Sequence, residues 1–161
     1  MHLTHTLPIF IDESSQILIL GSFPSVKSRE VMFYYGHPQN RFFAVLGSLF
    51  NEDAPLSVEG RKVFLKRHKI ALYDVIEECD IEGSADSSIK NVIPIDIELV
   101  LRRYKNIKVI GVNGNKAKEL FIKYLLDKVG STKVIYLPST SLANAKMNLE
   151  ALVSRYKELL K

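Results

Sequence analysis

The chain has 161 residues, of which 47% are apolar and 25% charged. This length and composition are typical of one globular domain, residues 1–161, and exclude a disordered chain. The net charge of +4 permits binding to a polyanion such as nucleic acid but does not require it. The sequence has no run of about 18 apolar residues and no secretory leader, so we expect a cytoplasmic protein without a membrane anchor. The single cysteine, Cys79, excludes an internal disulfide and fits a reducing compartment.

Four short apolar runs, each followed by turn-forming or polar residues, predict buried strands. In chain order they are residues 16–20 (QILIL), 69–75 (KIALYDV), 107–112 (IKVIGV) and 132–137 (TKVIYL). Segments with apolar residues at helical spacing alternate with them, at 40–50, 58–67, 95–104, 115–129 and 147–160. This alternation predicts an α/β fold, a three-layer α/β/α sandwich around a short, mostly parallel four-stranded sheet.

The segments that follow the predicted strands should meet at one edge of the sheet, because parallel strands end at the same edge. They are GSFPS (21–25), the residues from Asp74 onward, VNGNKA (112–117) and PSTSLANA (138–145). Their Gly, Pro, Ser and Asn residues turn the chain and present backbone N–H groups and short polar side chains. The string YYGHPQNRFF (34–43) adds four aromatic rings, two amides, a His and an Arg. Any one loop could be merely a turn, but together they predict a binding site.

Several chemistries are excluded by missing motifs. No Walker lysine, GxGxxG or GxSxG pattern occurs, and one cysteine with four histidines shows no zinc-like spacing. A catalytic carboxylate pair remains open, because Asp74, Asp80, Asp86 and Asp96 lie around the end of the second predicted strand.

The aromatic rings, amides and hydroxyls favour a site that grips a flat heterocycle, as in enzymes that extrude a base from DNA. Basic side chains near the mouth of such a site could neutralise backbone phosphates. The candidates are Lys27, Arg29, Arg41 and Lys146.

In chain order, GSFPS, FYYGHPQNRFF, ALYDV, GSADSSIKNV, VNGNKA and LPSTSLANA resemble the motifs of the uracil-DNA glycosylase superfamily. The hypoxanthine-DNA glycosylase (DNA-deoxyinosine glycosylase) branch is nearest, and the mismatch-specific uracil/thymine glycosylases share the HPxNRF element. The resemblance implies a three-layer α/β/α fold, in agreement with the periodicity. It also implies base-excision repair by hydrolysis of the N-glycosidic bond of hypoxanthine, with uracil or xanthine as further substrates. The implied enzyme uses no metal or cofactor and acts on DNA as a monomer.

The resemblance also implies roles for individual residues. Asn40 would hold the attacking water, because Phe23 stands in GSFPS where many relatives have a water-activating Asn or Asp. The residues expected to contact the base are Gly21, Ser22, Phe23, Tyr35, Asp74 and Asn113. The residues expected to contact DNA, in a loop that enters the minor groove, are Pro138, Ser139, Thr140, Ser141, Leu142, Asn144 and Lys146.

Each role has a structural alternative. Asn40 could only cap a helix that begins at Arg41, and Tyr35 could be a core ring. Asp74 could be protonated or structural, because an ionised carboxylate opposes the departure of an anionic base. Leu142, by contrast, could gain a function, because its apolar side chain could wedge into the space left by an extruded base. A non-catalytic nucleic-acid-binding module on the same fold is the main functional alternative, and a nucleoside hydrolase is a weaker one.

Overall fold

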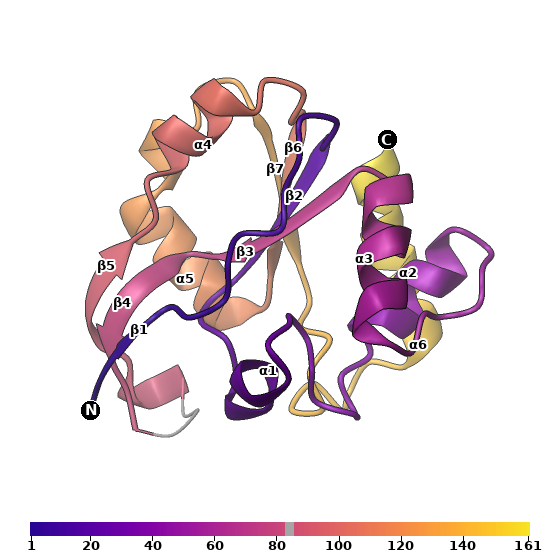
Figure 1. Ribbon diagram of the computed structural model, residues 1–161, viewed down its shortest axis with the longest axis horizontal. Coiled ribbons are helices and arrows are strands. Elements are labelled where there is room, and N and C mark those ends of the chain that lie inside the picture. Colours follow the sequence, from indigo (N-terminus) through magenta and orange to yellow (C-terminus); the bar gives the residue numbers. More distant parts are fainter. Residues whose placement is uncertain (83–85) are drawn as a thin grey trace.

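The four predicted strands form one parallel sheet in the computed structural model, which describes residues 1–82 and 86–161 (Figure 1). They are β2 (Ile17–Gly21), β3 (Ile70–Asp74), β6 (Val109–Asn113) and β7 (Lys133–Leu137), in the spatial order β3-β2-β6-β7. Every residue of β2, β3 and β6 is buried, as expected for a sheet covered on both faces. The predicted sheet is confirmed, with small shifts at the strand ends. The first three residues of the GSADSSIKNV segment, 83–85, lie outside the described residues.

Helices cover both faces of this sheet and complete the predicted three-layer sandwich. On one side lie α4 (Ile97–Arg103) and α5 (Asn115–Tyr124), and on the other α2 (Phe42–Leu49), α3 (Val58–Arg67) and α6 (Leu149–Tyr156) (Figure 1). The 3-10 helices η2 (Leu126–Lys128) and η3 (Lys157–Leu160) extend α5 and α6. One cluster of buried apolar residues joins the layers. In the part of the chain that the structure describes, no helix is long and apolar enough to cross a membrane.

A second sheet and two short helices are absent from the sequence-based prediction. The strands β1 (His2–Thr4), β4 (Ile76–Asp80) and β5 (Lys90–Pro94) pair antiparallel in the order β1-β4-β5, and the additional helices are α1 (Val26–Val31) and η1 (Asp86–Ser88). Register shifts interrupt the pairing of β4 with β5, and both strands are only partly buried. Their apolar residues therefore follow neither a continuous nor a strictly alternating pattern. Strand β4 continues almost directly from β3, so it carries β1 toward the end of the parallel sheet.

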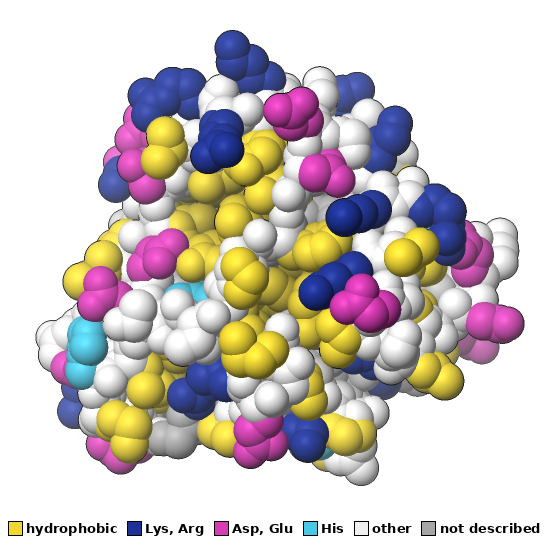
Figure 2. Space-filling view, viewed as in Figure 1, with side chains coloured by type: hydrophobic (Ala, Val, Ile, Leu, Met, Phe, Trp, Pro, Cys, Tyr) yellow, Lys and Arg dark blue, Asp and Glu magenta, His cyan; other side chains and the backbone are white. Residues whose placement is uncertain are grey.

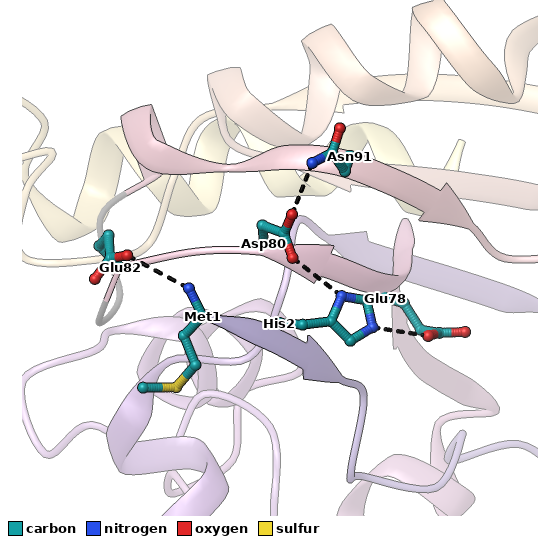
Figure 3. A network of polar contacts seen from close by, with 6 residues as sticks. All are labelled: Met1, His2, Glu78, Asp80, Glu82 and Asn91. Carbon is teal, nitrogen blue, oxygen red and sulfur yellow. Dashed lines mark hydrogen bonds and ion pairs between the residues drawn. The ribbon is translucent and has the colours of Figure 1, made fainter.

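An exposed polar network fastens β1 to β4 (Figure 3). Nδ1 of His2 lies 3.0 Å from an Asp80 oxygen, and Nε2 lies 3.0 Å from a Glu78 oxygen. Asn91 Nδ2 donates to the other Asp80 oxygen at 2.7 Å. An imidazole with a carboxylate at each nitrogen donates to both only when it is protonated. Hydrogen bonds to Glu78 and Asp80 therefore raise the pKa of His2 above its ordinary value of 6.5.

We expect His2 to stabilise the fold most in mildly acidic solution. Because its folded-state pKa lies above the unfolded-state value, the stabilisation is complete below pH 6.5 and is lost as the pH rises through the raised pKa. The unfolding free energy of the unsubstituted protein minus that of His2→Gln, from urea titrations, should be larger at about pH 6 than at about pH 9. A difference that does not change with pH would show that the His2 charge contributes nothing.

Candidate functional site

The carboxyl ends of the parallel strands open into a cavity of about 830 Å³, a size typical of small-molecule sites. The residues predicted to contact base or DNA line it, with the exception of Lys146, which is exposed on the loop after β7. They are Gly21, Ser22, Phe23, Tyr35, Asn40, Asp74, Asn113, Pro138, Ser139, Thr140, Ser141, Leu142 and Asn144. The sheet therefore brings YYGHPQNRFF together with the polar segments that follow the strands, as the parallel topology predicts.

Asn40 lines the cavity, and two donors fix the orientation of its amide. Its Oδ1 accepts from the backbone N–H of Phe42 at 2.9 Å and from the Thr140 hydroxyl at 2.9 Å. These bonds use both lone pairs of the oxygen, so the free group is Nδ2, which has no hydrogen-bond partner among residues 1–82 and 86–161. Helix α2 begins at Phe42 with Arg41 as its N-cap, so the predicted start at Arg41 is wrong by one residue. Asn40 nevertheless satisfies one N–H of the first turn.

Thr140 connects Asn40 to the end of β6. Its side chain is buried, and its hydroxyl donates to Asn40 Oδ1 while accepting from Asn113 Nδ2 at 3.3 Å. Its carbonyl accepts from the Arg41 backbone N–H at 3.0 Å. The chain Asn113–Thr140–Asn40 therefore joins three segments that lie far apart in the sequence. Such a chain holds the Asn40 amide against the rigid end of the sheet.

The loop after β7 is shaped by its own hydrogen bonds and by Arg41. Ser139 Oγ donates to Ser141 Oγ at 3.0 Å, and Asn144 Nδ2 donates to the Ser139 carbonyl at 2.9 Å. The Arg41 guanidinium donates to the carbonyls of Asn144 and Met147. Arg41 is therefore an anchor of this loop, and a contact of its guanidinium with phosphate stays a prediction. The two serines shape the loop, while their contact with DNA stays a prediction.

Tyr35 has a backbone conformation that is rare for an aromatic residue. Its φ of +54° lies in the left-handed region, where strain is characteristic of functional segments. Phe42 covers one face of the ring, with centroids 3.8 Å apart and planes at 14°. Burial and the nearby charge of Asp74 raise the pKa of the Tyr35 hydroxyl, which therefore stays protonated. Stacking on a base stays a prediction, and it requires the face opposite Phe42.

Asp74 ends β3 and makes a contact that no sequence pattern predicted. Its Oδ2 lies 2.8 Å from Nε2 of His5, and the two side chains are 6% and 0% exposed. The partner of Asp74 across the β2–β3 pairing is Gly21, where a Cβ would lie 2.6 Å from Asp74 Oδ1. A glycine is therefore required at this position for the carboxylate to keep its place.

Among the described side chains, which do not include that of Asp86, there is no carboxylate pair at the end of β3. Asp80 belongs to the exposed network around His2, and Asp96 accepts from the Leu99 N–H as the N-cap of α4. Asp74 has a histidine as its hydrogen-bond partner. Among the described residues, no group of three or more His, Cys, Asp or Glu side chains could hold a metal ion.

The first turn of α5 also lines the cavity; it lies in the VNGNKA segment expected at this edge, although Asn115 and Lys116 are not among the predicted site residues. Gly114, at φ +97°, precedes the helix, and no side chain caps the free N–H groups of this turn. Asn115 and Lys116 contribute to the cavity wall there. An uncapped helix start suits an anion, and the adjacent Lys116 lies 3.4 Å from a Glu119 oxygen, with which it forms an ion pair. On the face seen in Figure 2, by contrast, basic and acidic side chains are mixed.

Comparisons with known proteins agree with this site. The family model of the Uracil DNA glycosylase superfamily matches residues 8–161. A Hypoxanthine DNA glycosylase of Methanosarcina barkeri is 39% identical over 113 residues, which cover 70% of this chain and 72% of that protein. A Hypoxanthine DNA glycosylase of Methanosarcina acetivorans is 36% identical over 143 residues, covering 88% of each chain.

A solved structure extends the agreement to the whole fold. The solution NMR structure of a Methanosarcina acetivorans protein, described as a candidate uracil DNA glycosylase, superposes with a TM-score of 0.82 at 31% identity. The superposition covers 100% of both chains. The chain belongs to the uracil-DNA glycosylase superfamily.

Proposed function

We propose that the protein is a DNA glycosylase of base-excision repair that hydrolyses the N-glycosidic bond of deaminated bases, hypoxanthine first, with uracil and xanthine as further candidates. The observation that carries the proposal is the Asn113–Thr140–Asn40 chain, which fixes an amide at the wall of a cavity large enough for a base. The two Methanosarcina relatives, named for hypoxanthine, support the choice of base. A monomer suffices for this chemistry.

The chemistry follows from the oriented amide. Nδ2 of Asn40 would donate a hydrogen bond to one lone pair of a water oxygen. The other lone pair of this water is then directed at the sugar C1′. The C1′–N bond breaks as the C1′–O bond to the water forms. The electron pair of the C1′–N bond departs with the base, and the water loses a proton to solvent. Because the sugar carbon becomes cationic as the base leaves, a neutral water positioned in line is nucleophile enough. Backbone N–H groups of the GSFPS segment, which the resemblance to the family places toward the base, would stabilise the negative charge that the base gains.

The proposal is tested with labelled duplexes that each carry one hypoxanthine, uracil, xanthine or mismatched thymine, followed by alkaline cleavage of abasic sites. We expect strand scission at hypoxanthine and none in the undamaged duplex. Tight binding without scission on any substrate would leave the non-catalytic binding module as the function. Cleavage of free deoxyinosine but not of DNA would instead identify a nucleoside hydrolase.

Leu142 supplies a prediction about base extrusion. Its side chain is 58% exposed at the cavity mouth, where an apolar group could occupy the space left by the base. We expect Leu142→Ala to lower hypoxanthine excision about 10-fold in a paired duplex, which corresponds to unstacking of the order of 1 kcal/mol, and little in single-stranded DNA.

The matched control for Leu142→Ala is Leu99→Ala. Leu99 lies on α4, is 51% exposed and does not line the cavity, so its loss should leave excision unchanged. If Leu142→Ala lowers the excision rate equally in paired and in single-stranded DNA, Leu142 is not a wedge. Its loop would then only contact the DNA.

A further inference from the structure

His5 and Asp74 form a buried pair, and a third group sets the tautomer of the histidine. His5 Nδ1 accepts from the backbone N–H of Leu7 at 3.2 Å, so this nitrogen carries no proton. The ring proton is therefore on Nε2, which donates to Asp74 Oδ2 at 2.8 Å. The imidazole is neutral and serves as a fixed donor to one oxygen of the carboxylate.

Aromatic contacts and a backbone hydrogen bond set the direction of this donor. The His5 ring stacks on Tyr73, with centroids 4.3 Å apart, and meets the edge of Phe23 at 5.6 Å. The His5 backbone N–H donates to the Glu77 carbonyl at 2.7 Å, which continues the pairing of β1 with β4. The ring cannot turn away from Asp74 without breaking these contacts.

The second oxygen of Asp74 is left available at the cavity. In the described part of the chain, Asp74 Oδ1 has no hydrogen-bond partner, although the side chain is only 6% exposed and lines the cavity wall. Absence of a side chain at Gly21 keeps the space beside Oδ1 open. A carboxylate oxygen held in this way is an acceptor that needs an N–H donor from whatever enters.

We propose that His5 is a positioning residue that, through Asp74, makes the cavity select bases with an N–H on the edge they present. This inference rests on the proposed function and names the chemical group that it recognises. Hypoxanthine carries N1–H beside its carbonyl, and uracil carries N3–H beside its carbonyl, whereas adenine N1 and cytosine N3 are bare acceptors. A bare acceptor facing Oδ1 leaves two acceptors opposed without a proton, which is unfavourable in a buried site. The same contact therefore accepts both deaminated bases and rejects their parents.

The hydrogen bond from His5 also reduces the repulsion between Asp74 and the negative charge of the departing base. A bare carboxylate beside a base that leaves as an anion opposes its departure, because like charges repel more strongly in a buried site. Donation from His5 Nε2 draws part of the Asp74 charge toward Oδ2, away from the base. The His5–Asp74 pair thus keeps an acceptor that recognises the base while it weakens the repulsion between the carboxylate and the departing anionic base.

The test compares single-turnover excision of hypoxanthine with that of 1-methylhypoxanthine, in which a methyl group replaces the N1 proton. Rates are measured over a range of enzyme concentrations, to separate binding from the maximal rate. We expect the unsubstituted protein to prefer hypoxanthine about 10- to 100-fold, the effect of one buried acceptor left unpaired. His5→Phe keeps an aromatic ring against Tyr73 but loses the donor, and its preference should collapse toward parity. His5→Gln offers an amide donor and should retain most of it.

Thermal unfolding of both variants accompanies the kinetics. If the two substrates slow equally in His5→Phe, with the preference unchanged, His5 is merely structural and the inference is wrong. Equal excision of both bases by the unsubstituted protein overturns it without any variant. No excision of hypoxanthine by the unsubstituted protein overturns the proposed function, and the inference with it.

Discussion

Replacing Asn40 with alanine should lower the maximal rate of hypoxanthine excision about 100- to 1000-fold, while affinity for DNA changes little. The reason is geometric, since Asn40 Oδ1 is engaged by Phe42 and Thr140 and only Nδ2 is free to hold a water. Single-turnover kinetics on a deoxyinosine duplex, with binding measured separately, give the two quantities. Unchanged turnover in Asn40→Ala would remove this residue from the mechanism.

Two substitutions at Thr140 are the matched controls for Asn40→Ala. Thr140→Val removes the hydroxyl that orients Asn40 and leaves Asn113 Nδ2 without its acceptor, so excision should fall although Asn40 is still present. Thr140→Ser keeps the hydroxyl and should keep most of the rate. Asn40→Ala also removes the acceptor of the Phe42 N–H, which should lower the free energy of unfolding by about 1 kcal/mol. Thermal unfolding measures this loss of stability separately from the loss of catalysis.

Replacing Gly21 with alanine should both destabilise the protein and impair excision. The new Cβ would lie 2.6 Å from Asp74 Oδ1 and 3.6 Å from the Tyr35 hydroxyl, so the carboxylate must move. Because Asp74 is held by buried His5, we expect a loss of about 1–3 kcal/mol in the free energy of unfolding, as for other overpacked sites. Excision of hypoxanthine should fall about 10- to 100-fold as the acceptor leaves its position.

The double variant Gly21→Ala, Asp74→Ala tests this explanation. Removing the carboxylate relieves the close approach, so the two destabilising effects should be less than additive, as measured by urea unfolding of both single variants and the pair. Excision should not recover, because the acceptor is gone. Fully additive losses of stability would mean that the Gly21 effect does not act through Asp74.

The parallel sheet could be predicted from the sequence because burial on both faces leaves a simple signature. All five residues of each of β2, β3 and β6 are buried, and each strand is an apolar run up to its last residue, which is Gly21, Asp74 or Asn113. The antiparallel sheet leaves no such signature, because β4 and β5 are partly exposed and their register shifts. Helix α1 (Val26–Val31) is too short to show a helical period.

The candidate site could be predicted where it depends on strand ends and not where it depends on distant contacts. Gly21, Asp74 and Asn113 are recognisable because parallel strands end at one edge. His5 lies 69 positions from Asp74 in a segment with no motif, and only the pairing of β1 with β4 brings it there. The orientation of the Asn40 amide likewise depends on Thr140, 100 positions away. Sequence patterns carry little information on such single side-chain contacts.

We expect the cavity at the end of the sheet to remove hypoxanthine from DNA by hydrolysis, with Asn40 holding the attacking water. Free hypoxanthine and abasic sites should therefore be quantified in the same single-turnover reaction, for the unsubstituted protein and for Asn40→Ala. We expect one abasic site for each hypoxanthine released by the unsubstituted protein, and almost no abasic sites or free hypoxanthine from Asn40→Ala. Bound DNA with no base released, or equal release by both proteins, would contradict this expectation.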